Sequence, residues 1–311
     1  MDRQLYEAQL FTRILAAFSA NGAERNLHSI ILSGSFGRGE ATYHGGVLES
    51  DVELGLVYRR GRRRQTQEML RTVAAQFSEE LNCMPFPRGR IRRACNFNYS
   101  LLPSRWKTVF TFDLFRGSKT LWGEELLEAN TSRDLRLDPY EAKRIVANRI
   151  GELSLSESAG ERRRWQAKLI LAIGAAWLIA EGLYQSSYRA QNRCILEHTD
   201  ALSALLGSSF PEDYHSAFAF LREGADCFAA EDPFLRSYVE IIGDFFKRKG
   251  ISRPRVNNFA RWLKYFLKYL RHGGRRLGRI EDNILSSLLA EYAADGPQLQ
   301  KSAVCWHAVL Y

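Results

Sequence analysis

The spacing of apolar residues divides the chain into segments of strand type and of helix type. Residues 27–33, LHSIILS, form a short β-branched run closed by glycines, and residues 51–58, DVELGLVY, alternate carboxylates with aliphatic residues at their start. Both patterns predict strands. Residues 65–81 carry apolar positions at helical spacing, and residues 95–102 and 108–115 are again strand-like. This order predicts a small mixed sheet with flanking helices.

The pattern changes near Asp138, because from Pro139 onward strand patterns nearly vanish and helical stripes follow one another. Proline and glycine separate these stripes, as helix ends require. The breaks fall at Gly207, Pro211, Pro233, Pro254 and Gly273-Gly274. We therefore expect an α/β (α+β) domain over residues 1–137, followed by an all-α helical bundle over residues 138–311.

Composition supports folded domains, since 45% of the 311 residues are hydrophobic. Residues 1–18 mix charges with apolar residues at helical spacing, which predicts an amphipathic helix and argues against a signal peptide. The longest apolar run starts at Leu169, contains Glu181 and is too short to span a bilayer. The five cysteines show no CxxC pairing, which favours reduced thiols. These features predict a cytoplasmic protein without a membrane segment.

The chain is basic, with a formal net charge of +9 and arginine-rich clusters. The clusters lie at residues 59–64, 88–93, 162–164 and 247–279. Such clusters attract phosphates and nucleic acid, although a solvated basic surface explains them equally well. None of the six histidines shows a metal-ligand spacing such as HxxxH, so we assign none of them to a metal.

Residues 34–57, GSFGRGEATYHGGVLESDVELGLV, combine a glycine turn with a carboxylate pair. A glycine-rich turn between a strand and a helix exposes backbone N–H groups that can hold phosphate oxygens, and Ser35 adds a hydroxyl. Asp51 and Glu53 stand two positions apart on a predicted strand, so both side chains leave the same face. Two such carboxylates repel unless a cation lies between them, and Mg²⁺ prefers oxygen ligands. The segment therefore suits phosphoryl or nucleotidyl transfer.

These residues resemble the polymerase-β-like nucleotidyltransferase superfamily. Its signature is a Gly-Ser turn, here Gly34-Ser35, followed by Asp-x-Asp or Asp-x-Glu on the next strand, here Asp51 and Glu53. The superfamily also carries a third carboxylate on a later strand, and Asp113 in VFTFDLFRGSKTLWG resembles it. The resemblance covers roughly residues 28 to 123, and it rests on these motifs together with their predicted strand context. The gap between Ser35 and Asp51 is longer than is common, which indicates either a loop that shapes an acceptor pocket or a degenerate site.

The resemblance implies a metal-dependent transferase of nucleoside monophosphates that uses a nucleoside triphosphate, with ATP as the expected donor. Asp51, Glu53 and Asp113 would hold two Mg²⁺ ions, for which Mn²⁺ could substitute, and Asp113 would also be the candidate general base. The hydroxyl acceptor is left open between a small molecule, a protein side chain and RNA, and the basic clusters favour an anionic acceptor. The alternative is a catalytically silent fold of this type that binds nucleic acid or a partner protein.

The resemblance also assigns residues to the triphosphate. Gly34, Ser35 and Arg38 would hold the β- and γ-phosphates, since the arginine fork pairs with phosphate oxygens. For Arg38, a solvent-exposed turn residue is an equally good interpretation. Lys168 lies on a predicted helix of the second domain, where superfamily members often place a lysine that reaches the triphosphate. Packing or a surface salt link is the simpler interpretation of Lys168.

Overall fold

The computed structural model divides into two compact units, Met1–Leu137 with Ser186–Tyr188, and Asp138–Gln185 with Arg189–Tyr311. The boundary after Leu137 lies where the sequence pattern changes from mixed to helical. The described residues are 3–44, 47–48, 50–77, 81–87 as backbone, 108–127, 137–223, 225, 228, 232–251 and 292. The predicted strand at 95–102, the basic cluster at 88–93 and most of the cluster at 247–279 lie outside them.

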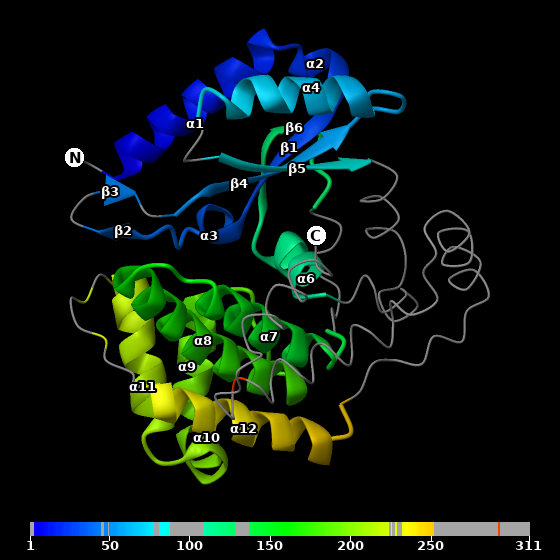
Figure 1. The fold of residues 1–311 in the computed structure, drawn as a ribbon. Coiled ribbons are helices and arrows are strands. Elements are labelled where there is room, and N and C mark those ends of the chain that lie inside the picture. Colours follow the sequence, from blue (N-terminus) through cyan, green and yellow to red (C-terminus); the bar gives the residue numbers. More distant parts are fainter. Residues whose placement is uncertain are drawn as a thin grey trace. The chain divides into compact units, whose positions relative to one another are not determined.

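A four-stranded mixed sheet forms the centre of the first unit, in the order β5-β4-β1-β6 (Figure 1). β1 is antiparallel to both β4 and β6, whereas β4 and β5 are parallel. The strands are β1 (Leu27–Ser33), β4 (Val52–Tyr58), β5 (Leu81–Pro87) and β6 (Lys119–Gly123). A two-stranded ribbon of β2 (Tyr43–His44) and β3 (Val47–Leu48) lies between β1 and β4 in the sequence. The mixed α+β architecture and the strand predicted at 27–33 are confirmed. The strand predicted at 51–58 is confirmed from Val52 onward, and Asp51 lies just before it.

Helices α1 (Arg3–Ala20), α2 (Ala23–Asn26) and α4 (Arg63–Ala74) lie on one side of this sheet (Figure 1). Alternate residues of β1 and β4 pack with α1 and α4 in one apolar cluster, which includes Leu10, Ile14, Phe18, Ile30, Leu32, Val52, Leu54, Leu56, Met69 and Val73. Because side chains alternate along a strand, Glu53 points to the opposite face of the sheet. The predicted helix at 65–81 is wrong at its end, since α4 stops at Ala74 and Leu81 begins β5.

The predicted strand at 108–115 is also wrong, because these residues form helix α6 (Val109–Arg116). The Thr108 hydroxyl caps the helix by accepting a hydrogen bond from the Thr111 N–H at 3.1 Å. The buried residues Phe112 and Phe115 are three positions apart, as on one face of a helix, although the segment is also rich in residues that favour strands. Asp113 therefore lies on a helix, and the strand that pairs with β1 is the following segment, β6.

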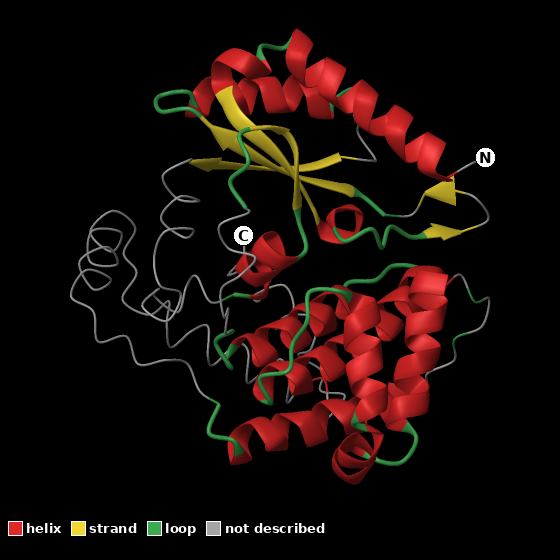
Figure 2. Ribbon diagram, turned by 180° about the vertical axis from the view of Figure 1, so that it is seen from behind, coloured by secondary structure: helices red, strands yellow, loops and turns green. Residues whose placement is uncertain are grey.

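In the second unit all regular elements among the described residues are helical, and Figure 2 shows strands only in the first unit. The helices are α7 (Glu141–Ser154), α8 (Ala159–Ala180), α9 (Tyr188–Glu197), α10 (Thr199–Leu206), α11 (Phe210–Phe218), a π-helical turn (Ala219–Glu223) and α12 (Asp232–Arg248). A capping box between Ser158 and Glu161 starts α8, whose second half is almost entirely buried. No helix in the described part of the chain is both long and apolar enough to cross a membrane.

Replacing Gly174 by alanine should destabilise the helical unit, because the new Cβ would clash with the Tyr214 ring of α11. Overpacking of this kind costs ~1–3 kcal/mol. The matched change Gly243→Ala in α12 meets no atom within 4 Å and should stabilise the helix by up to ~1 kcal/mol. Urea unfolding of both variants measures the difference, and equal effects would contradict the close packing of α8 on α11.

Candidate active site on the first unit

The Gly34 backbone approaches the Glu53 side chain closely where β1 passes into the short helix α3 (Gly34–Gly37). Gly34 has φ +63°, and a Cβ atom there would lie 2.6 Å from the carboxyl carbon of Glu53. Ser33 pairs with Glu53 across the sheet and donates its hydroxyl hydrogen bond to the Glu53 carbonyl oxygen at 3.3 Å. Glycine is thus required both by the left-handed backbone and by the nearby carboxylate. The structure brings together the glycine turn and the second carboxylate of the predicted pair.

Asp51 directly precedes β4 and is exposed, whereas Glu53 lies within the strand and is half-buried. The start of this strand is fixed by the Ser50 hydroxyl, which accepts a hydrogen bond from the Thr42 N–H at 2.9 Å. Asp51 forms no hydrogen bond or ion pair with any other described residue. Its carboxylate is therefore open to a ligand from solvent, and it lies two residues before Glu53 in the chain.

Arg38 is engaged by two carboxylates. Its Nε lies 3.3 Å from Glu40 Oε2, its Nη1 lies 3.8 Å from Asp113 Oδ2, and only 9% of its side chain is exposed. The guanidinium also lies over the Tyr188 ring, 5.2 Å from the ring centre. Arg38 is thus a nearly buried residue of an ion-pair network. The alternative interpretation of Arg38 as a solvent-exposed turn residue is wrong.

Glu40 is a buried residue of this site that the sequence reasoning missed. Only 5% of its side chain is exposed. Its carboxylate accepts hydrogen bonds from the Ser187 hydroxyl at 2.7 Å and from the Tyr188 N–H at 3.1 Å. The one signal in the sequence is a carboxylate directly after Gly-Arg-Gly, and its partners lie almost 150 residues further along, where no local pattern could indicate them.

Two further glycines bring α3 against the end of α6. A Cβ atom on Gly37 would lie 2.6 Å from the carbonyl oxygens of both Leu32 and Gly117. A Cβ atom on Gly117 would lie 2.8 Å from Cγ of Arg38. Backbone therefore touches backbone at this point, and the Arg38 stem lies on the Gly117 backbone. These contacts place Asp113, one turn before Gly117 in α6, beside the Arg38 guanidinium.

Lys168 lies in a basic part of the second unit. Its Nζ is 3.9 Å from the centre of the Trp165 ring, and the Arg149 guanidinium is 5.7 Å from the same ring. Burial and, to a smaller extent, the charges of Arg149 and Arg164 together lower the pKa of Lys168 to about 8. The simpler interpretation, that Lys168 packs against its helical neighbours, fits this environment.

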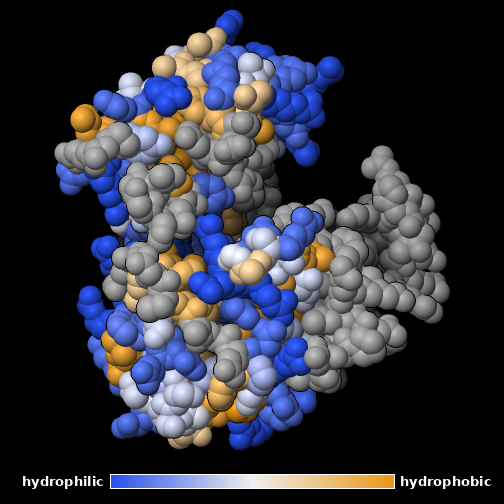
Figure 3. Space-filling model, turned by 60° about the vertical axis from the view of Figure 1, so that its left-hand side comes forward, coloured by the Kyte–Doolittle hydropathy of each residue, from blue (hydrophilic) through white to orange (hydrophobic). Residues whose placement is uncertain are grey.

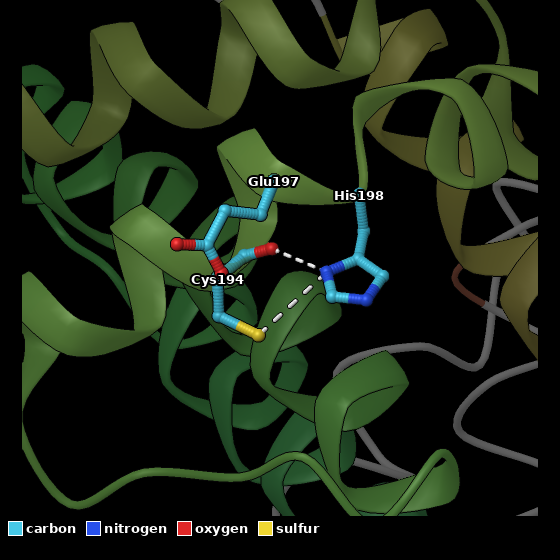
Figure 4. Close-up of side chains that lie close together, drawn as sticks. All are labelled: Cys194, Glu197 and His198. Atoms are coloured by element: carbon cyan, nitrogen blue, oxygen red, sulfur yellow. Dashed lines mark hydrogen bonds between the residues drawn. The ribbon is translucent and has the colours of Figure 1, made fainter.

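A second group of ligand-type atoms lies at the end of α9, from Cys194, Glu197 and His198 (Figure 4). These atoms all lie within 4.8 Å of one another. His198 Nδ1 is 2.8 Å from the Cys194 carbonyl oxygen and 3.8 Å from its Sγ. A protonated Nδ1 donates to this helix-end carbonyl, which positions the ring without an ion. Thiol and imidazole are softer ligands than Mg²⁺ prefers, so this cluster is unsuited to the predicted metal.

The surface of the first unit carries exposed basic residues in the turn after β4 and at the start of α4. Arg60, Arg62 and Arg63 are exposed, and their side chains form no ion pair with the residues that the structure describes. Large exposed apolar side chains are scattered, and Figure 3 shows separate hydrophobic areas among hydrophilic ones. The described surface thus offers a charged feature, and no broad apolar one, to a partner.

Comparison of the chain with models of protein families, with curated protein sequences and with solved structures gives no significant match. The mixed α+β sheet and the helical second unit describe the fold and do not identify a function. Any function must therefore be argued from the residues and contacts of the site.

The pKa of Lys168 predicts a pH dependence of stability. The folded chain has the lower pKa, about 8 against 10.5 for the free side chain, so the unfolded chain binds the extra proton between these values. The free energy of unfolding should therefore rise with pH in this window, by up to ~1.4 kcal/mol per pH unit. The pH profile of the free energy of unfolding of Lys168→Met, measured with urea, contains the contributions of the other titrating groups. Subtracting it from the profile of the unaltered protein isolates the contribution of Lys168. A difference that is flat from pH 8 to pH 10 would contradict the burial of a charged Lys168.

Proposed function

We propose that this protein is a metal-dependent nucleotidyltransferase, which moves a nucleoside monophosphate, AMP in the first instance, from a nucleoside triphosphate to a hydroxyl acceptor. The observation that carries the proposal is the contact between the Gly34 backbone and the Glu53 carboxylate, with Asp51 two residues away. A glycine turn beside a carboxylate pair supports the proposal, because phosphoryl chemistry combines a backbone cradle for phosphate with carboxylates that hold a metal ion.

The donor set fits a hard divalent cation. Asp51 and Glu53 offer only carboxylate oxygens, and Asp51 is exposed without a partner among the described residues. Mg²⁺ favours such oxygen ligands and usually shares them with substrate phosphates and water. When bound, the ion neutralises charge on the phosphates and polarises the reacting phosphoryl group. Asp113 fits less well as a third ligand, because its carboxylate already faces Arg38 at 3.8 Å.

The remaining residues bind and orient the donor. Ser35 lies in the turn that follows Gly34, and its carbonyl oxygen accepts a hydrogen bond from the Glu40 N–H at 2.7 Å, which fixes the turn. Its hydroxyl and the adjacent backbone N–H groups can donate to the β- and γ-phosphates. Arg38 acts through its charge rather than by direct phosphate contact, because its guanidinium is held by two carboxylates.

The second candidate function is a non-catalytic binding module. The exposed arginines Arg60, Arg62 and Arg63 favour it, since they could dock a polyanion without any chemistry at Asp51. The same arginines favour an anionic acceptor, including RNA, if the protein is an enzyme. A small hydroxyl compound or a protein side chain would gain little binding free energy from these arginines.

Replacing Asp51 by asparagine should reduce transfer at least about 100-fold, the scale of losing one charge-stabilising group. The assay supplies Mg²⁺ and each of four α-³²P-labelled triphosphates, with cell RNA, cell protein and small metabolites as separate acceptor pools. The control Asp200→Asn changes an exposed aspartate of α10 and should leave transfer unaltered. Absence of label in every pool, together with RNA binding that Asp51→Asn leaves intact, would establish the binding module instead.

Replacing Gly34 by alanine should displace the Glu53 carboxylate, because the carboxylate is the mobile end of its side chain and lies within 3 Å of the new Cβ. Binding of Mn²⁺ should weaken about 10-fold or more, as when a group that orients a ligand is changed. Gly39→Ala is the matched control, since Gly39 also has a positive φ of 68° but no atom within 4 Å of the added Cβ.

Both glycine variants should lose ~1–2 kcal/mol of stability through the left-handed backbone alone. Only Gly34→Ala should lose affinity for the ion, measured by calorimetric titration with Mn²⁺. Equal affinities in the two variants would show that the Glu53 carboxylate takes no part in binding the cation.

A further inference from the structure

The Arg38 guanidinium lies beside Asp113, where the sequence led us to expect a metal ion. Arg38 Nη1 lies 3.8 Å from Asp113 Oδ2, and Arg38 Nε lies 3.3 Å from Glu40 Oε2. All three side chains belong to the first unit. One fixed cation thus serves two carboxylates, and Asp113 already has a positive partner supplied by the chain itself.

Arg38 is held in place from several directions. Glu40, which binds Arg38, is itself fixed by the Ser187 hydroxyl and the Tyr188 N–H. The Arg38 stem lies against Gly117, and the Tyr188 ring lies 5.2 Å from the guanidinium carbon. Because removing a charge from its partner in a buried place is costly, the guanidinium will not leave this network readily. It is a permanent feature of the site rather than a surface side chain that turns toward a substrate.

A divalent cation on Asp113 would stand next to this guanidinium. Like charges at such a separation repel strongly where water is largely excluded, and only 9% of Arg38 is exposed. Asp51 presents the opposite situation, since it is exposed and has no cation beside it among the described residues. Asp51 and Asp113, two of the three predicted metal-binding carboxylates, therefore differ in their need for a metal ion.

We propose that the site takes a single divalent cation, at Asp51 and Glu53, and that the Arg38 guanidinium, positioned by Glu40, supplies the second positive charge at Asp113. This inference rests on the proposed function for the identity of the substrate, a nucleoside triphosphate. It replaces the two-ion expectation of the sequence with one ion and one arginine. Arg38 and Glu40 are then positioning residues of the reaction.

Electron paramagnetic resonance of Mn²⁺ bound to the full chain distinguishes one ion from two. The probe is Mn²⁺ with α,β-methylene ATP, which cannot transfer its nucleotide. A single ion gives an uncoupled six-line spectrum, whereas two ions ~3.5–4 Å apart, as in two-metal sites, give a spin-coupled spectrum. We expect the uncoupled spectrum and one ion per chain. A coupled spectrum, two ions per chain or no bound ion would overturn the inference.

Variants assign the ion to its ligands. Asp51→Asn should weaken Mn²⁺ binding at least 10-fold, whereas Asp113→Asn should change it less than threefold. Equal losses in the two variants would overturn the inference. Arg38→Gln should create a second, coupled ion at Asp113, and Arg38→Lys, which keeps the positive charge, should not. If circular dichroism shows that Arg38→Gln does not fold, the comparison of Asp51→Asn with Asp113→Asn still decides.

The labelled-transfer assay on the same protein separates this inference from the proposed function. Transfer with a coupled two-ion spectrum would keep the enzyme and reject the single-ion site. One ion at Asp51 without transfer to any acceptor would keep the cation site and reject the transferase.

Discussion

The turn at Gly34–Gly37 is the point on which the candidate site depends, because at this turn the backbone approaches other groups too closely for any side chain. A Cβ atom on Gly34 would meet the Glu53 carboxylate, and one on Gly37 would meet the backbone oxygens of Leu32 and Gly117. Strand β1, strand β4 and the end of helix α6 therefore converge on four residues. The direction in which Arg38 leaves the turn follows from this packing, and with it the pairing of Arg38 with Asp113.

Charge, rather than apolar packing, organises what surrounds the turn. Arg38 and Glu40 are both nearly buried and compensate each other, and Glu40 adds hydrogen bonds to Ser187 and Tyr188. Such a network contributes little to stability in comparison with apolar residues of the same volume, but it fixes the geometry of its members. It also joins residues 186–188, far along the chain, to the first unit. A network of this kind suits a site whose charges must stay in place.

The sequence predicted what depends on local pattern and missed what depends on distant contacts. β1 and β4 were predictable because apolar and β-branched residues between turn residues have few alternatives. The helix over Val109–Arg116 was missed because a short aromatic run fits both periods, and the Thr108 cap decides between them. Gly34 and Glu53 were paired by motif, and the structure adds their contact. Glu40 could not be found, since its partners Ser187 and Tyr188 are remote in sequence.

The carboxylates at the start of β4 favour an enzyme over a binding module on electrostatic grounds. Asp51 and Glu53 lie two residues apart, and the described residues place no cation beside Asp51. Such a pair costs free energy through repulsion unless a cation binds, and it would weaken the attraction of a polyanion for the same unit. Asp113, by contrast, is compensated by Arg38 within the chain. A fold that only docked polyanions would gain nothing from an exposed carboxylate at Asp51, whereas the proposed binding of one divalent ion gives that carboxylate a role.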